Sequence, residues 1–173
     1  MEKLNQVAYD KNWTLEGFSY VNNRIQWVES TQVLADKIIH ALVEYLEVPA
    51  GAIYFFKEEE QELEMVSAVS VGRASIKKFK LGEGIVGNAA MQKMPSLIKH
   101  IPPSYWRVVT GLGEITGNGQ IMCVPLWVNG ELKGLIELGC FDNFTPLQQT
   151  FLNNIGDMLG TAINSAQARD KIE

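Results

Sequence analysis

The feature that most constrains the fold is a mostly apolar segment, residues 120–139, with an Asn-Gly pair at Asn129 and Gly130. An Asn-Gly pair favours a type I′ turn, because both central residues of that turn need a positive φ. Residues 121–128 and 131–138 are therefore predicted to form an antiparallel hairpin. Residues 121–128 are apolar at nearly every position and residues 131–138 are mostly apolar, so we expect other elements to cover both faces of their sheet.

The composition fits a globular domain and argues against two classes of partner. With 173 residues, of which 46% are hydrophobic and 20% charged, the chain can bury a sizeable core. A net charge of −5 disfavours nucleic acid and anionic membrane surfaces as partners. No apolar run has the length of a membrane span or the pattern of a signal peptide. We therefore expect a cytoplasmic protein.

The cysteines and histidines do not predict a metal or redox centre. Cys123 and Cys140 lie in apolar strand segments and are expected to be buried, reduced thiols. His40 and His100 have no second His, Cys or acidic residue at the spacing of metal ligands. No metal site is predicted.

Two helices are predicted before the strands. Asn5–Val28 has a weak apolar pattern at spacings of three and four, and Gly17 lowers its helix propensity further. The second helix is clearer, with Ser30 or Thr31 as its N-cap and an apolar stripe that ends near Val48.

The last helix is predicted to begin at Pro146, after a cap within residues 143–145. Its apolar face continues to Ala166, and the pattern then fades without a stop signal. We therefore expect this helix to continue into a further domain.

Further strands are predicted between these helices. Ala52–Phe56 and Leu63–Val71 are expected to pair, with the charged residues 57–62 as their exposed connection. Ser96–Lys99 is predicted as a short edge strand.

Gly82, Gly84 and Gly87 have the G-x-G-x-x-G spacing of a dinucleotide-binding loop. That fingerprint requires a buried strand before it and an acidic residue about 20 positions after it, and neither is present. We interpret the glycines as a structural turn that begins a short helix, Ile85–Gln92.

Residues 101–118 form a long polar segment, and long loops within compact domains are usually functional or mobile. Its side chains Tyr105, Trp106, Arg107 and Glu114 could hold a small molecule. Trp106 with Tyr105 is the predicted lid, although both rings could instead anchor the loop.

Glu137 is a carboxylate in an otherwise apolar strand, so it needs a hydrogen bond, an ion pair or a neutral state. Two interpretations stay open: a structural bond to loop backbone, Arg107 or Lys99, or contact with a ligand. Strand alternation groups its side chain with Leu135 and Gly139. On the partner strand, alternation groups Ile121, Cys123 and Pro125.

Four segments of the chain resemble GAF domains, which sense small molecules in signalling proteins. They are AIYFF at 52–56, FKLGEGIVGNAAMQKMP at 79–95, VPLWVNGELKGLIELGCF at 124–141 and FTPLQQTFLNNIGDMLGTAINSAQAR at 144–169. The similarity is strongest to bacterial GAF modules beside outputs such as histidine kinases.

The resemblance implies an α+β fold related to profilin-like and PAS domains. Its antiparallel sheet would have five or six strands, with the terminal helices on one face and a ligand pocket under a loop on the other. Residues 30–173 would form this domain with its long C-terminal signalling helix, and residues 1–29 an N-terminal helical extension.

Several GAF subfamilies are disfavoured by residues that this sequence lacks. The segment 101–118 has no cysteine for a covalent bilin, and the cyclic-nucleotide signature is missing near Asn143. Free methionine-R-sulfoxide reductases carry cysteines near the glycine turn and in the mobile loop, and this sequence has none there. Their hairpin strand also bears two acids, of which Glu137 matches one and Gly139 stands at the other. Without a thiolate that reaction cannot start, so we predict no enzyme and no cofactor.

The resemblance therefore implies a sensory domain that relays ligand occupancy through its terminal helices, as a homodimer joined to an output domain. The residues predicted to contact the ligand are Tyr54, Tyr105, Trp106, Glu114, Ile121, Cys123 and Glu137. One alternative is a dimerisation spacer whose pocket is filled by Trp106, Phe141 and Tyr54. Another is a residual redox enzyme with a reactive Cys123 or Cys140.

Overall fold

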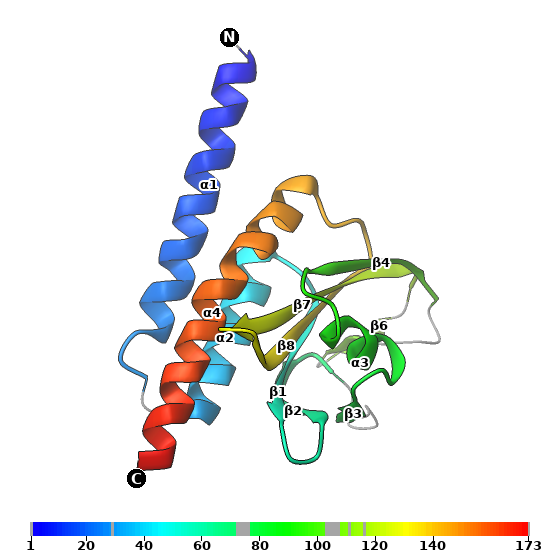
Figure 1. Cartoon of the computed structure of the whole chain (residues 1–173). Coiled ribbons are helices and arrows are strands. Elements are labelled where there is room, and N and C mark those ends of the chain that lie inside the picture. The colour runs from blue at the N-terminus through cyan, green and yellow to red at the C-terminus, as the bar shows by residue number, and fades with distance from the viewer. Residues whose placement is uncertain are drawn as a thin grey trace.

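The computed structural model describes residues 2–28, 30–71, 77–102, 108–110, 112–115 and 117–172, of which 108–110, 113–115 and 171–172 are described by backbone alone. An antiparallel six-stranded sheet with the order β3-β2-β1-β8-β7-β4 forms its centre (Figure 1). Its strands are β1 (Ala50–Lys57), β2 (Glu62–Val69), β3 (Lys78–Lys80), β4 (Ser96–Ile101), β7 (Gly119–Val128) and β8 (Glu131–Cys140). The helices of the described ranges are α1 (Glu2–Ile25), α2 (Thr31–Leu46), α3 (Gly84–Ala90) and α4 (Pro146–Ile172). The predicted α+β fold is confirmed.

The predicted hairpin is the centre of the sheet. β7 and β8 pair from Gln120 opposite Cys140 to Val128 opposite Glu131. Their turn has φ values of 52° at Asn129 and 79° at Gly130, the positive values that a type I′ turn needs. β8 also pairs with β1, and β7 with the edge strand β4. Both hairpin strands therefore lie inside the sheet.

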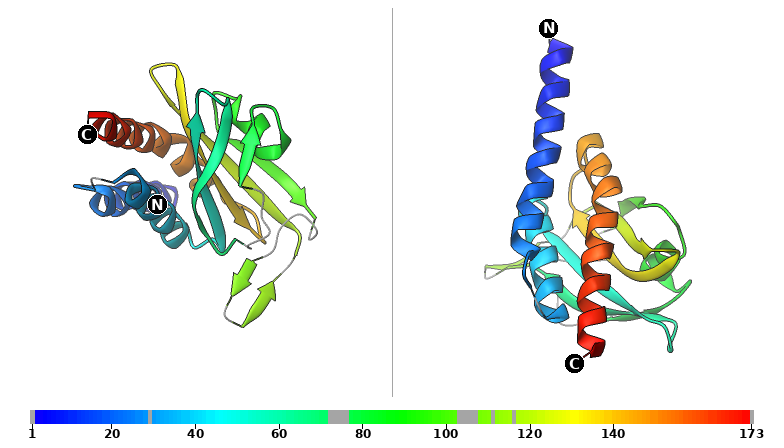
Figure 2. Two further views of the ribbon diagram at one scale, coloured as in Figure 1. Left: turned by 90° about the horizontal axis from the view of Figure 1, so that it is seen from below. Right: turned by 60° about the vertical axis from the view of Figure 1, so that its left-hand side comes forward.

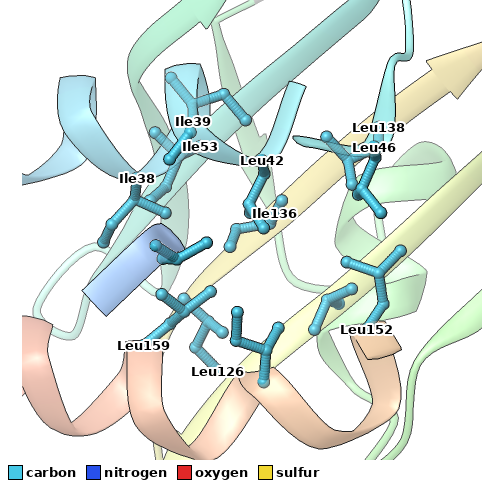
Figure 3. Packing of buried hydrophobic residues seen from close by; sticks show 14 of the residues in the cluster. Ile38, Ile39, Leu42, Leu46, Ile53, Leu126, Ile136, Leu138, Leu152 and Leu159 are labelled. Atoms are coloured by element: carbon cyan, nitrogen blue, oxygen red, sulfur yellow. The ribbon is translucent and has the colours of Figure 1, made fainter. Parts of the chain in front are cut away.

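The sheet separates two hydrophobic clusters of side chains. α1, α2 and α4 lie on one face of the sheet, and α3 lies on the other (Figure 2). Side chains of α2, α4 and the central strands interlock on the helix face, among them Leu42, Leu152 and Ile136 (Figure 3). No helix within the described ranges is long and apolar enough to cross a membrane.

Strand alternation divides the hairpin side chains between these clusters. Met122 and Val124 belong to the cluster under the helices, whereas Ile121 and Cys123 belong to the cluster beside α3. The predicted grouping of Ile121 with Cys123 is confirmed. The hairpin sequence is mostly apolar because each side of the hairpin has its own core.

The helix α4 begins with a reciprocal capping box. The Gln148 amide donates to Thr145 Oγ1 at 3.1 Å, and the Thr145 amide donates to Gln148 Oε1 at 2.9 Å. α2 begins after Ser30, whose Oγ accepts a 3.4 Å bond from the Val33 amide. Both predicted helix starts are confirmed.

The segment 101–118 contains more regular structure than the sequence predicted. β5 (Val108–Thr110) and β6 (Gly113–Ile115) form a separate two-stranded sheet. β3 was also missed, because a three-residue strand is too short to show a repeating apolar pattern.

The weakly patterned helix α1 docks through its C-terminal half. A Cβ atom at Gly17 would lie 2.5 Å from ring carbons of both Tyr45 and Phe151, so only glycine permits this close approach. The Trp13 ring packs nearby, with its centroid 4.9 Å from that of Tyr45 in a tilted contact and 5.3 Å from that of Phe151 in an edge contact. The N-terminal half of α1 extends beyond the rest of the domain (Figure 1). Tertiary contacts thus supply the stability that the helix lacks by itself.

The Gly17 contact predicts a stability effect with a matched control. Gly17→Ala should lower the free energy of unfolding by about 1–3 kcal/mol, because two aromatic rings must move to admit the methyl group. Gly156→Ala on α4 places its Cβ 3.5 Å from Val124, an ordinary contact, and should be neutral or stabilising by up to about 1 kcal/mol. Chemical denaturation measures both variants, and equal midpoints would contradict this account of α1 docking.

Candidate functional site

The candidate site is the sheet face opposite the terminal helices. A hydrophobic cluster there joins β1, β7 and β8 to α3. The strand residues that form its floor are Ala52, Tyr54, Ile121, Cys123 and Leu135. Val86, Ala89 and Ala90 of α3 pack against this floor.

A glycine turn fixes the start of α3. The Gly82 amide donates to the Gly87 carbonyl at 3.0 Å, and the Lys80 amide donates to Glu83 Oε2 at 2.9 Å. A Cβ atom at Gly87 would lie 2.2 Å from the Lys80 carbonyl oxygen. Close packing of the backbone on itself therefore accounts for the glycine spacing, as the structural interpretation predicted.

Glu137 lies in a row of small side chains that crosses the sheet. Cys123 and Ala52 are its direct neighbours on β7 and β1, and the row continues to Ser96 on β4 and Ala68 on β2. Residues directly opposite in adjacent strands project from the same face. The carboxylate is therefore flanked by short side chains on the same face of the sheet.

Tyr54 is the partner of this carboxylate. Its hydroxyl donates to Glu137 Oε1 at 3.0 Å, and the tyrosine is almost completely buried. Burial raises the pKa of Glu137 above its ordinary value, and the Tyr54 bond opposes that shift. No basic side chain within the described residues forms an ion pair with Glu137. The sequence did not indicate Tyr54 as the partner, because the contact depends on the pairing of β1 with β8.

The predicted site residues divide into three groups. Tyr54, Ile121, Cys123 and Glu137 lie together on this face, as predicted. Glu114 lies in β6, where the backbone alone is described. Tyr105 and Trp106, like the suggested partner Arg107, lie outside the described residues.

The two cysteines lie on opposite sides of the sheet. Burial raises the pKa of the Cys123 thiol well above its ordinary value, and the charge of Glu137 adds to that effect. Burial also raises the pKa of Cys140 to about 11, and its thiol donates to the Asp142 carbonyl at 3.1 Å. Both thiols therefore stay protonated at neutral pH, and the described residues contain no cluster suited to a metal ion.

A surface hollow of about 470 Å³ lies between α3 and β4. Its lining combines polar and apolar side chains: Ile85, Asn88, Ala89, Gln92, Ser96 and Ile98. Ser96 belongs to the same cross-strand row as Glu137, so the hollow lies at the edge of the candidate site. The sequence predicted both flanking elements, but the space between them depends on tertiary packing.

The raised pKa of Glu137 predicts a pH-dependent stability. The folded protein binds this proton more tightly than the unfolded chain, where the ordinary value is 4.5. The stability contributed by Glu137 is therefore greatest below that value and falls as the pH rises through the folded pKa. Glu137→Gln is neutral at every pH and can still accept the Tyr54 bond.

Relative to wild type, Glu137→Gln should gain free energy of unfolding as the pH is raised from acidic to neutral. Denaturant titrations at several pH values measure the difference. Glu131→Gln, at an exposed position of the same strand, is the control and should follow the wild-type curve. A constant difference between Glu137→Gln and wild type would show that burial does not perturb Glu137.

Comparison with known proteins identifies a family that matches this chain. A family model described as GAF domain matches residues 28–164. Similar solved structures include the GAF domain of a Coxiella burnetii phosphoenolpyruvate-protein phosphotransferase, with TM-score 0.76, 17% identity and coverage of 91% of this chain and 96% of that one. The GAF domain of A. aeolicus nlh2 in an inactive state has TM-score 0.68 and 23% identity over 90% of this chain and 98% of its own.

A Neisseria meningitidis free methionine-R-sulfoxide reductase in complex with its substrate has TM-score 0.70 and 12% identity, with 90% of each chain covered. At these identities the structures show a shared fold. No curated protein matches the chain. The family match spans most of the sequence, and the chain therefore belongs to the GAF domain family.

Proposed function

We propose that this GAF domain senses a small molecule and regulates a bacterial signal-transduction protein in the cytoplasm, such as a histidine kinase. The observation that carries the proposal is Glu137, a half-buried carboxylate that Tyr54 holds on an otherwise apolar floor. A floor with few, well-positioned polar groups is typical of small-molecule sites, because those groups orient the ligand.

The strand β8 could transmit a change at the ligand site to the helices α2 and α4. Glu137 faces the candidate site, whereas its neighbours Ile136 and Leu138 pack in the cluster under α2 and α4. A ligand that prefers one arrangement of this strand would shift the population of helix arrangements. α4 would then pass the change to an output domain.

We propose that the domain is regulatory and is not an enzyme. The methionine sulfoxide reductase among the similar structures shares the fold. In this chain both cysteines are buried with raised pKa values, which disfavours a thiolate nucleophile.

A second candidate function is a dimerisation spacer without a ligand. Two observations favour it: Tyr54 is already packed within the cluster, and α3 covers part of the floor. In this case the side chains of the domain would themselves fill the pocket.

We propose that the helices on the face opposite the candidate site, α1 in particular, bind a second copy of the chain to form a homodimer. On α1 the side chains of Leu4, Val7 and Leu15 are exposed by 75%, 64% and 52%. Pairing of two such helices would remove this apolar surface from water.

Native mass spectrometry of the freshly purified protein tests for a ligand. Sensing predicts an added mass that is lost on denaturation, and Trp106→Ala should reduce its retention if Trp106 closes over the ligand. Trp27→Ala is the matched control, because Trp27 is 93% exposed on the loop between α1 and α2. An unliganded dimer that gains no thermal stability from any small molecule would favour the spacer.

Sedimentation velocity tests the proposed dimer. Leu4→Glu combined with Val7→Glu should weaken self-association at least tenfold, because each change places a charge in the apolar contact. Asn5→Glu lies on a different side of the same helix and should leave the association unchanged. A wild-type monomer at all concentrations would exclude signalling through paired helices.

A further inference from the structure

We propose that the ligand of this face carries a positively charged nitrogen group, such as an ammonium or amidinium, that binds the Glu137 carboxylate. The inference rests on the function proposed above and specifies the chemical class of its ligand.

The described residues use only part of the hydrogen-bonding capacity of the Glu137 carboxylate. An ionised carboxylate accepts hydrogen bonds at two oxygens and about four lone-pair positions. Among the described residues, Tyr54 is the one side chain that donates to it, and the bond goes to Oε1. Glu137 is half-buried, so part of the residue remains exposed among the described residues.

The described residues around Glu137 supply no positive charge to its carboxylate. The adjacent positions on β1 and β7 are Ala52 and Cys123, and the thiol is neutral because burial raises its pKa. The helix α3, which packs over the same face, has the sequence GIVGNAA and carries no charged side chain. A cation would therefore neutralise a charge that the described part of the protein leaves unpaired, whereas an anion would be repelled.

The floor around Glu137 consists of small and apolar side chains. The small side chains of Ala52, Ala68, Cys123 and Ser96 flank the carboxylate along its row. Ile121 and Leu135 provide apolar surface on the same face. A compact ligand with a cationic nitrogen and a short apolar body matches both features.

Binding of a cation at Glu137 should depend on pH. Within the described residues the titratable groups that face Glu137 are the Tyr54 hydroxyl and the Cys123 thiol, and burial raises the pKa of that thiol so that it stays protonated at physiological pH. Glu137 therefore controls the charge of the floor. Affinity for a cation should fall as the pH decreases through the raised pKa of this carboxyl group.

Three probes of equal size test the charge preference: benzamidine, benzamide and benzoate. Each is titrated into the full ¹⁵N-labelled chain, and binding is monitored at the backbone amides of β7 and β8. Benzamidine should bind at least tenfold more tightly than benzamide, and benzoate more weakly than both. Glu137→Gln should abolish the preference for benzamidine, whereas Glu131→Gln on the same strand should preserve it.

Equal binding of benzamidine and benzamide, or a preference for benzoate, would overturn the cation inference while supporting a ligand site. No perturbation of β7 and β8 by any of the three probes would count against both the inference and the proposed sensing function. If Glu137→Gln does not fold, the wild-type titration is repeated at lower pH. Benzamidine affinity that does not fall with decreasing pH would then overturn the inference.

Discussion

The rest of the structure depends on the burial of one hairpin from both sides. β7 and β8 lie inside the sheet, so their alternating side chains supply both the core beneath the helices and the floor opposite them. Apolar burial contributes about 25 cal/mol per Å² of surface removed from water, and here it acts on both faces of the same strands. A shift of one residue in register would exchange the two sets of side chains.

Glu137 is the exception to this apolar pattern, and its setting links stability with function. Its neighbours oppose its charge by excluding water, and the Tyr54 hydroxyl compensates in part. The strand that carries it also packs against α2 and α4 through Ile136 and Leu138. A group that is costly to bury thus lies on an element that contacts both layers of the domain.

The helix layer shows how tertiary contacts can stabilise a weak local preference. α1 has little amphipathic pattern, and Gly17 lowers its intrinsic helix propensity. The same glycine lets the helix approach Tyr45 and Phe151 closely enough for aromatic packing. A residue that appears unfavourable in the sequence therefore makes the docking of α1 possible.

The sequence by itself determined the long elements, the Asn-Gly turn, the two-sided hairpin and the faces of Ile121, Cys123 and Glu137, because each depends on a local pattern or a fixed period. Tertiary structure alone decided that Tyr54 binds Glu137, that the small residues of four strands flank the carboxylate, and that a hollow lies between α3 and β4. It also placed short strands in residues 78–80, 108–110 and 113–115, where three residues carry too little periodic signal. These features join residues far apart in the chain, so they depend on strand order and register rather than on neighbouring residues.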